Sequence, residues 1–166
     1  MLRYPGKPPN LLLTALILVA LGPLLFVMAD EALGQKTRGS QAIGEDPVFQ
    51  EYRGVTIGLS ATEVRKKLGS PRDKGDEQDF FVISDKETIQ VLYDKSQLVT
   101  AISVDLLSGA KAIPTAATIF GADIEAKPNG SMYKMVRYPK AGYWVSYNRT
   151  AGATPLTSVT IQKLEQ

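Results

Sequence analysis

The sequence predicts an α+β fold. Two tandem helix-plus-three-strand repeats are expected to form one antiparallel sheet with helices packed on one face, preceded by an N-terminal hydrophobic segment. Three observations support this prediction. A short helix with both ends marked lies between Ser60 and Gly69, three strand-like segments follow it, and a similar order returns about 55 residues later. Neither unit is long enough to bury a good core alone, so we expect them to share one sheet.

Residues 1–29 form the hydrophobic segment. Arg3 and Lys7 precede an uncharged apolar run from Leu11 to Ala29, with the small residues Val27 and Ala29 at its end. This pattern predicts a signal peptide that is cleaved before Asp30. The run is also close to the roughly 20 residues that span a bilayer, so a membrane anchor remains the alternative. Either way, we expect an exported chain that is periplasmic or extracellular, or held at the inner membrane by this segment.

Residues 30–45 are small, polar and rich in glycine, which predicts a flexible spacer. The folded body is then expected over 46–166, with repeat one at 46–110 and repeat two at 111–166. At the start of the body, Asp46 can cap a helix, Pro47 suits the first helical position and Gly54 can end the turn. These residues predict a short helical turn.

The helix between Ser60 and Gly69 is the strongest local prediction. Ser60 is a favoured N-cap and Glu63 completes a capping box, in which each side chain accepts a hydrogen bond from the other residue's free backbone N–H. Val64 and Leu68 are one turn apart and share a buried face. Gly69 can adopt the left-handed cap conformation, and the following proline prevents the helix from continuing.

Six segments have the composition of strands. In the first half they cover residues 79–84, 88–94 and 98–106, and in the second half 131–138, 142–148 and 156–164. Within 88–94, Ile89, Val91 and Tyr93 alternate with less apolar residues, as in a half-buried strand. Tyr147 corresponds to Tyr93 in the second half, where residues 112–121 are expected to take the place of the first helix.

Composition limits the chemistry that is available. The chain contains no cysteine and no histidine, which excludes disulfides, thiolate zinc sites and histidine-based catalytic triads. Arg3 and Lys7 are the only charged residues before Asp30, so residues 30–166 carry equal numbers of basic and acidic residues. A neutral body argues against nucleic-acid binding.

Three fragments suggest chemistry but lack its context. Ser108–Lys111 and Ser131–Lys134 match the S-x-x-K pattern, yet neither serine is expected to begin a helix in a large domain. The acidic stretch 73–79 lacks the glycine and the final glutamate of a calcium-binding EF-hand loop. We therefore predict no catalytic residue, no metal site and no cofactor.

The segment around the first helix resembles the signature of the SmpA/OmlA group, the BamE-like outer-membrane assembly lipoproteins. The residues that carry the resemblance are Gly58, Ser60, Glu63, Val64, Leu68, Gly69 and Pro71. The repeated order resembles the tandem arrangement of the β-lactamase inhibitor protein (BLIP). The resemblance implies a scaffold and no active site. Without cysteine, this chain lacks the lipid attachment of the BamE-like proteins and the disulfides of the inhibitor.

Strand alternation also predicts a binding surface. If Ile89 and Val91 face the helices, then Gln90 and Leu92 lie on the opposite face of the sheet, together with Trp144, the only tryptophan. Exposed aromatic residues with an arginine nearby are typical anchors for a protein partner. Tyr133 and Arg137 are expected on the neighbouring strand. The alternative is that a loop or the spacer covers Trp144, because large apolar residues are mostly buried.

These observations favour a non-catalytic exported protein-binding module, with an accessory role in envelope or outer-membrane assembly as the main hypothesis. A secreted or periplasmic enzyme inhibitor of the β-lactamase-inhibitor type is the first alternative. The second is an enzyme of unknown type that uses carboxylates and lysines. The expected partner is a protein or peptide of the cell envelope. Contact with a membrane is expected only through residues 11–29, if these are retained.

Overall fold

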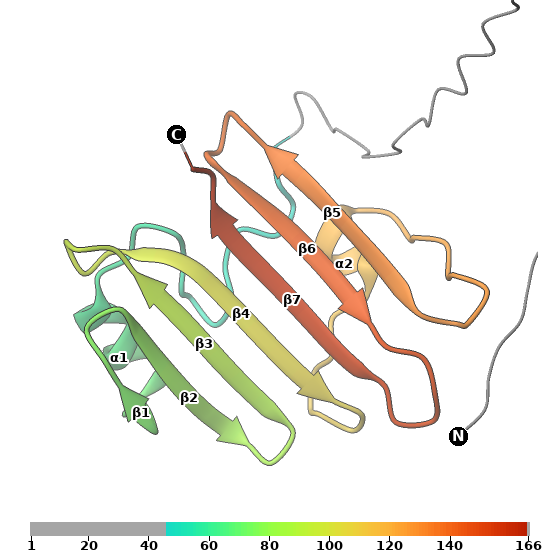
Figure 1. The fold of residues 1–166 in the computed structure, drawn as a ribbon, viewed down its shortest axis with the longest axis horizontal. Helices are drawn as coiled ribbons and strands as arrows, with labels where there is room; N and C mark the ends of the chain where they lie inside the picture. Colours follow the sequence, from blue (N-terminus) through green and yellow to red (C-terminus); the bar gives the residue numbers. More distant parts are fainter. Residues whose placement is uncertain (1–45, 166) are drawn as a thin grey trace, which may run out of the picture. The chain divides into compact units, whose positions relative to one another are not determined.

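A computed structural model describes residues 46–165. The signal peptide or anchor predicted for 1–29 and the spacer predicted for 30–45 lie outside the described residues. Within 46–165, no helix has the length and apolar character needed to cross a membrane. The elements, in chain order, are α1 (Ala61–Leu68), β1 (Asp73–Lys74), β2 (Gln78–Ser84), β3 (Glu87–Tyr93), β4 (Val99–Leu107), α2 (Ala116–Phe120), β5 (Met132–Tyr138), β6 (Tyr143–Arg149) and β7 (Leu156–Lys163) (Figure 1).

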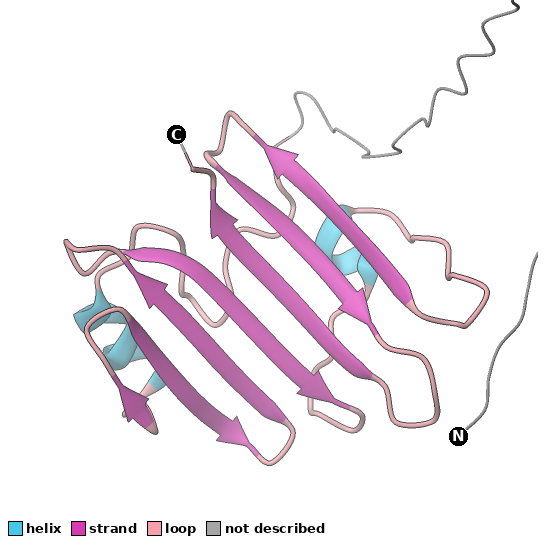
Figure 2. Cartoon of the chain, in the orientation of Figure 1, coloured by secondary structure: helices cyan, strands magenta, loops and turns pink. Residues whose placement is uncertain are grey.

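The strands form one antiparallel sheet in the order β1-β2-β3-β4-β7-β6-β5. Sequence neighbours pair through short turns, except at the centre, where β4 pairs with β7 from Ala101↔Gln162 to Leu107↔Leu156. This long-range pairing joins the strands of the two halves of the body. β1 and β5 are the two edge strands (Figures 1 and 2).

The predicted fold class is corrected by this architecture. The described residues are mostly a single seven-stranded antiparallel sheet and do not form two helix-plus-three-strand repeats with helices packed on one face. The helices have only 8 and 5 residues, and each has only two buried residues. The halves also differ, because β1 gives the first half a fourth strand. In the second half, Thr115 caps α2 without a glutamate partner, and Gly121, in the left-handed conformation (φ 74°), ends this helix after little more than one turn.

The core lies between one face of the sheet, here called the covered face, and a layer made largely of irregular chain. Val55 is fully buried, and Phe49, Tyr52, Ile57 and Leu59 pack against the core from the segment before α1. Ile89, Val91 and Tyr93, which alternate along β3 as predicted, are buried. On the neighbouring strands β4, β6 and β7 the buried residues include Ile102, Val104, Tyr143, Val145, Tyr147, Val159 and Ile161.

The capping prediction for α1 is confirmed, but the helical turn predicted at Asp46–Gly54 is wrong. Ser60 and Glu63 form the expected capping box. Residues 46–54 contain no helix. Tyr52 and Val55 instead exchange backbone hydrogen bonds of 3.0 and 2.9 Å across a tight turn. Arg53 and Gly54 have φ angles of 52° and 77°, a pair of positive values typical of a type I′ turn.

Candidate binding surface

The second face of the sheet, here called the open face, carries all five residues predicted to contact a partner. Gln90 and Leu92 are on β3, Tyr133 and Arg137 on β5, and Trp144 on β6. Gln90, Tyr133 and Arg137 are exposed, whereas Leu92 and Trp144 are partly buried. Trp144 is therefore neither fully exposed nor enclosed by the described part of the chain.

Strand register places three of these residues in one line across the sheet. Leu92 is opposite Ala101, which is opposite Gln162. Gln162 is opposite Trp144, which is opposite Arg137. Because neighbouring strands lie about 4.8 Å apart, Leu92 and Trp144 are separated by roughly 14 Å. The other two predicted residues lie outside this line, since Gln90 is two residues from Leu92 and Tyr133 is four residues from Arg137.

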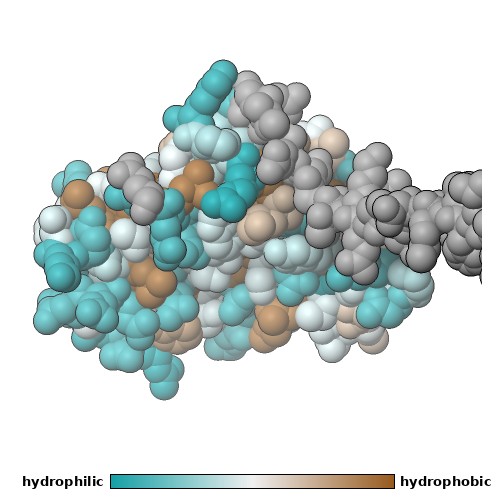
Figure 3. Space-filling view, turned by 45° about the horizontal axis from the view of Figure 1, so that its top comes forward, coloured by the Kyte–Doolittle hydropathy of each residue, from teal (hydrophilic) through white to brown (hydrophobic). Residues whose placement is uncertain are grey.

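Smaller side chains occupy the middle strands of this face. Ala101, Ser103, Ser146, Ser158 and Thr160 are there, and the hydroxyl groups of Ser103 and Thr160 are 3.1 Å apart. Larger side chains flank them on the outer strands, including the exposed Val82, Tyr133 and Met135. The surface coloured by hydropathy in Figure 3 likewise shows hydrophobic patches interspersed with hydrophilic ones. Such a surface combines apolar anchor points with hydrogen-bonding groups.

Three hollows follow the line from Leu92 to Arg137. The first, of about 1250 Å³, is lined by residues that include Glu77, Leu92 and Thr100. The second, of about 620 Å³, shares Thr100 with the first and continues along 162–165. The third, of about 270 Å³, shares 162–165 and adds Met135, Arg137 and Trp144. The shared residues make the three hollows neighbours, and together they are here called the depression.

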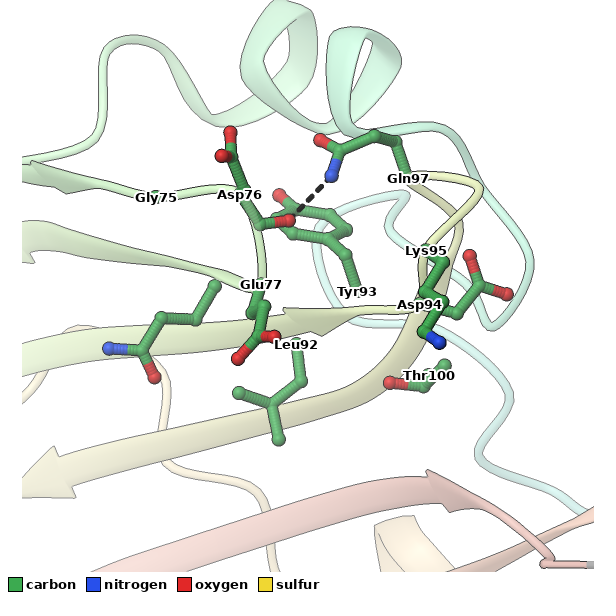
Figure 4. A pocket seen from close by; sticks show the side chains of 10 residues that line it. Gly75, Asp76, Glu77, Leu92, Tyr93, Asp94, Lys95, Gln97 and Thr100 are labelled. Carbon is green, nitrogen blue, oxygen red and sulfur yellow. Dashed lines mark hydrogen bonds between the residues drawn. The ribbon is translucent and has the colours of Figure 1, made fainter.

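The two ends of this depression differ in charge. Asp76, Glu77 and Asp94 line the first hollow together with one cation, Lys95. Figure 4 shows the side chains of Asp76 and Glu77 pointing to opposite sides of the chain. At the other end, Arg137 and Lys163 line the third hollow with one carboxylate, Glu165. The depression therefore has an acidic end, an apolar and amide middle, and a more basic end.

No family model, curated protein or solved structure matches this chain. The resemblance to the SmpA/OmlA group therefore stays a prediction, and the surface has to be interpreted from its own geometry.

Two buried ion-pair networks on the covered face were not predicted from the sequence. Asp79 is fully buried and accepts hydrogen bonds from Arg65 Nε at 2.8 Å, Arg65 Nη2 at 3.1 Å and the hydroxyl of Tyr93 at 2.8 Å. The sequence shows Asp79 only as the last member of an acidic stretch. Its position directly before the apolar run 80–83 was the available signal.

The second network likewise joins one carboxylate to one arginine and one tyrosine. Glu87 accepts hydrogen bonds from Arg53 Nε at 2.6 Å, Arg53 Nη2 at 2.8 Å and the hydroxyl of Tyr52 at 2.9 Å. The Arg53 hydrogen bonds hold the pKa of Glu87 below its usual value. Burial, reinforced by the hydrogen bond to Glu87, raises the pKa of Tyr52 to about 12. Each network connects one segment of the covering layer to the sheet.

Neither serine of the two S-x-x-K fragments begins a helix, because Ser108 follows β4 and Ser131 precedes β5. Ser131 donates a hydrogen bond of 2.8 Å to Asn129 Oδ1, and Lys134 Nζ lies 5.0 Å from the centre of the Phe120 ring. Ser108 is in an exposed turn after β4. Within residues 46–165, no three acidic residues come close enough together to hold a metal ion.

Proposed function

We propose that this chain is a non-catalytic module of the cell envelope that binds a protein or peptide on the open face of its sheet. The observation that carries the proposal is the line of Leu92, Trp144 and Arg137, which border one depression although they come from three different strands. Tryptophan and arginine are the residue types most enriched at the energetic centres of protein interfaces.

The hydrogen bonds that the two buried carboxylates accept support a role without catalysis. A general base needs a carboxylate that is free to accept a proton from a substrate. The two buried carboxylates among the described residues, Asp79 and Glu87, each accept two hydrogen bonds from an arginine and one from a tyrosine. Both face the covering layer and not the depression.

The cellular location in this proposal comes from the sequence. The basic start and apolar run of residues 1–29 support export, and the resemblance to the SmpA/OmlA group supports an accessory role in envelope assembly. A partner within the envelope would meet the open face without needing to enter the cytoplasm.

Site-specific photo-cross-linking in the cells that produce the protein tests the proposal. A benzophenone amino acid replaces Gln90, which is exposed on the open face, so that Trp144 is kept. The matched control carries it at Lys111, which is exposed beside Tyr52 and Arg53 on the other side of the molecule. We expect a discrete protein adduct from position 90 that is absent from position 111. No adduct at 90, or the same adducts at both positions, would refute binding at this face.

The captured partner then allows affinities to be compared. The chain has one tryptophan, so its fluorescence reports directly on the depression. We expect Trp144→Ala, measured by calorimetry, to weaken binding by about 30-fold or more, as for a typical interface anchor (about 2 kcal/mol). Lys111→Ala should bind like the wild type. Circular dichroism establishes that both variants remain folded.

A further inference from the structure

β5 is an edge strand that lacks three of the features that protect such an edge, namely a short length, a proline and a bulge, although it does carry the charged residues Lys134 and Arg137. It pairs with β6 over seven residues without a register shift and contains neither proline nor glycine. The opposite edge strand, β1, has only two residues. Proteins commonly protect sheet edges with very short strands, charged side chains, prolines or bulges, because the free N–H and C=O groups of an edge can pair with another strand.

We propose that β5 pairs antiparallel with β5 of a second copy, joining two sheets into one with both open faces on the same side. This inference goes beyond the proposed function and does not depend on it. It concerns the outer edge of Tyr133–Arg137, for which the described part of the chain provides no neighbouring strand. The open-face side chains of β5 remain accessible, since pairing uses the backbone edge.

Side chains select the register of this pair. With both open faces on one side, the three two-fold registers with the greatest overlap are centred on Lys134, Met135 or Val136. Centring on Lys134 places two ammonium groups opposite each other, which is destabilising. Centring on Val136 brings Tyr133 opposite Pro139, which has no N–H to donate. The Met135-centred register avoids both problems.

The Met135-centred register also creates favourable pairs. Met135 faces the same residue of the second copy, and Tyr133 faces Arg137 twice, once on each side of the two-fold axis. The side chain of Tyr133 is 53% exposed and that of Met135 40%, so both have surface to bury. A guanidinium over a tyrosine ring is attractive. Lys134 is opposite Val136 on the covered face, where no like charge meets it.

This pairing also extends the proposed binding surface. Arg137 ends the line that begins at Leu92. In the pair, Tyr133 of the second copy would be the next side chain in that line. A contact of one strand pair is small, in the class below about 1,200 Å² that is typical of weak complexes. We therefore expect reversible association that increases with concentration.

Cysteine cross-linking tests the proposal with little background, because the full chain contains no cysteine. Opposed residues in antiparallel strands have Cα atoms about 4.5–5.5 Å apart, a separation that suits a disulfide. We expect the full-length Met135→Cys variant, kept in non-ionic detergent, to form a covalent dimer on mild oxidation. Val82→Cys, with a similarly exposed apolar side chain on the same face, should stay monomeric.

A second experiment checks the register. Tyr133→Cys mixed with Arg137→Cys should give a heterodimeric disulfide. Tyr133→Cys alone should not, because its two copies would lie four residues apart along the strands, or about 13 Å. Sedimentation of the wild type between 10 and 500 µM should show a mass that rises with concentration. Wild type that stays monomeric, or Met135→Cys that cross-links no faster than Val82→Cys, would overturn the proposal.

Discussion

Arg65 holds Asp79 by two hydrogen bonds, of 2.8 and 3.1 Å, across the boundary between α1 and the sheet. The side chain of Asp79 has no exposed surface, whereas that of Arg65 is 23% exposed. A carboxylate removed from water to this degree depends on its partners for compensation. The pair therefore connects the position of α1 to that of β2.

Removal of the arginine from this pair should destabilise the fold strongly. Arg65→Ala leaves the Asp79 charge with only the Tyr93 hydroxyl as a donor, which we expect to cost about 3–5 kcal/mol in the free energy of unfolding. Urea denaturation provides the measurement. Arg72→Ala is the control, because Arg72 is exposed and forms no ion pair within residues 46–165. Equal losses in both variants would contradict a stabilising role for the pair.

Stability should decrease in acid through Glu87. Its folded pKa lies below its unfolded value, which is about 4.3, because Arg53 stabilises the charged form. The unfolded chain therefore binds a proton at Glu87 more readily than the folded chain does. The stabilisation that the Arg53–Glu87 pair provides is fully present above the unfolded pKa and is lost as the pH falls through the folded pKa. Glu87→Gln should therefore show a shallower decline in unfolding free energy between pH 5 and 2. Parallel curves for the two proteins would refute this assignment.

A separate decrease in the free energy of unfolding is expected at alkaline pH. Tyr52 has a pKa of about 12 in the fold, against about 10 in the unfolded chain, because burial and Glu87 disfavour the phenolate. Below pH 10 both states keep the proton, and between pH 10 and 12 only the unfolded state releases it. Tyr52→Phe should reduce the fall in unfolding free energy over this interval without abolishing it, since the pKa of Tyr93 is also raised. An unchanged fall would show that Tyr52 titrates normally.

The helix cap should have a measurable effect of its own. Ser60 Oγ accepts a hydrogen bond from the Glu63 N–H at 3.3 Å, and Glu63 Oε2 accepts one from the Ser60 N–H at 3.4 Å. Ser60→Ala should cost about 1 kcal/mol of unfolding free energy. Ser60→Thr should restore most of it, because threonine keeps a hydroxyl that can accept from the Glu63 N–H and donate to Glu63 Oε2, as Ser60 Oγ does at 2.9 Å. If alanine and threonine behave alike, the cap contributes nothing to stability.

Local signals were the most successful basis for prediction. The capping box at Ser60 was correctly predicted because both partners are within one helical turn. The strands and their faces were identified from alternation, which depends only on the two-residue period of an extended chain. For that reason the common open face of Leu92 and Trp144 could be inferred before their strands were known to be three positions apart.

Predictions that required contacts between distant residues were less successful. Asp46–Gly54 has the composition of a helical turn, but the segment is held as a tight turn by the Arg53–Glu87 pair, 34 residues away. Likewise, nothing in the acidic stretch 73–79 distinguishes the buried Asp79 from its neighbours except its position directly before the apolar run 80–83. The resemblance between the two halves suggested equal repeats, which the two-residue strand β1 and the five-residue helix α2 do not support.

The sequence by itself determined which residues begin and end α1, which side chains of β3 point to each side of the sheet, and which classes of catalysis the absence of cysteine and histidine excludes. The tertiary structure decided how the strands are ordered, that irregular chain covers most of the core, and that two arginines compensate two buried carboxylates. The physical reason is the distance along the chain over which each interaction acts. Capping and alternation act within a few residues, whereas strand order and ion pairing depend on which distant segments meet once the chain has folded.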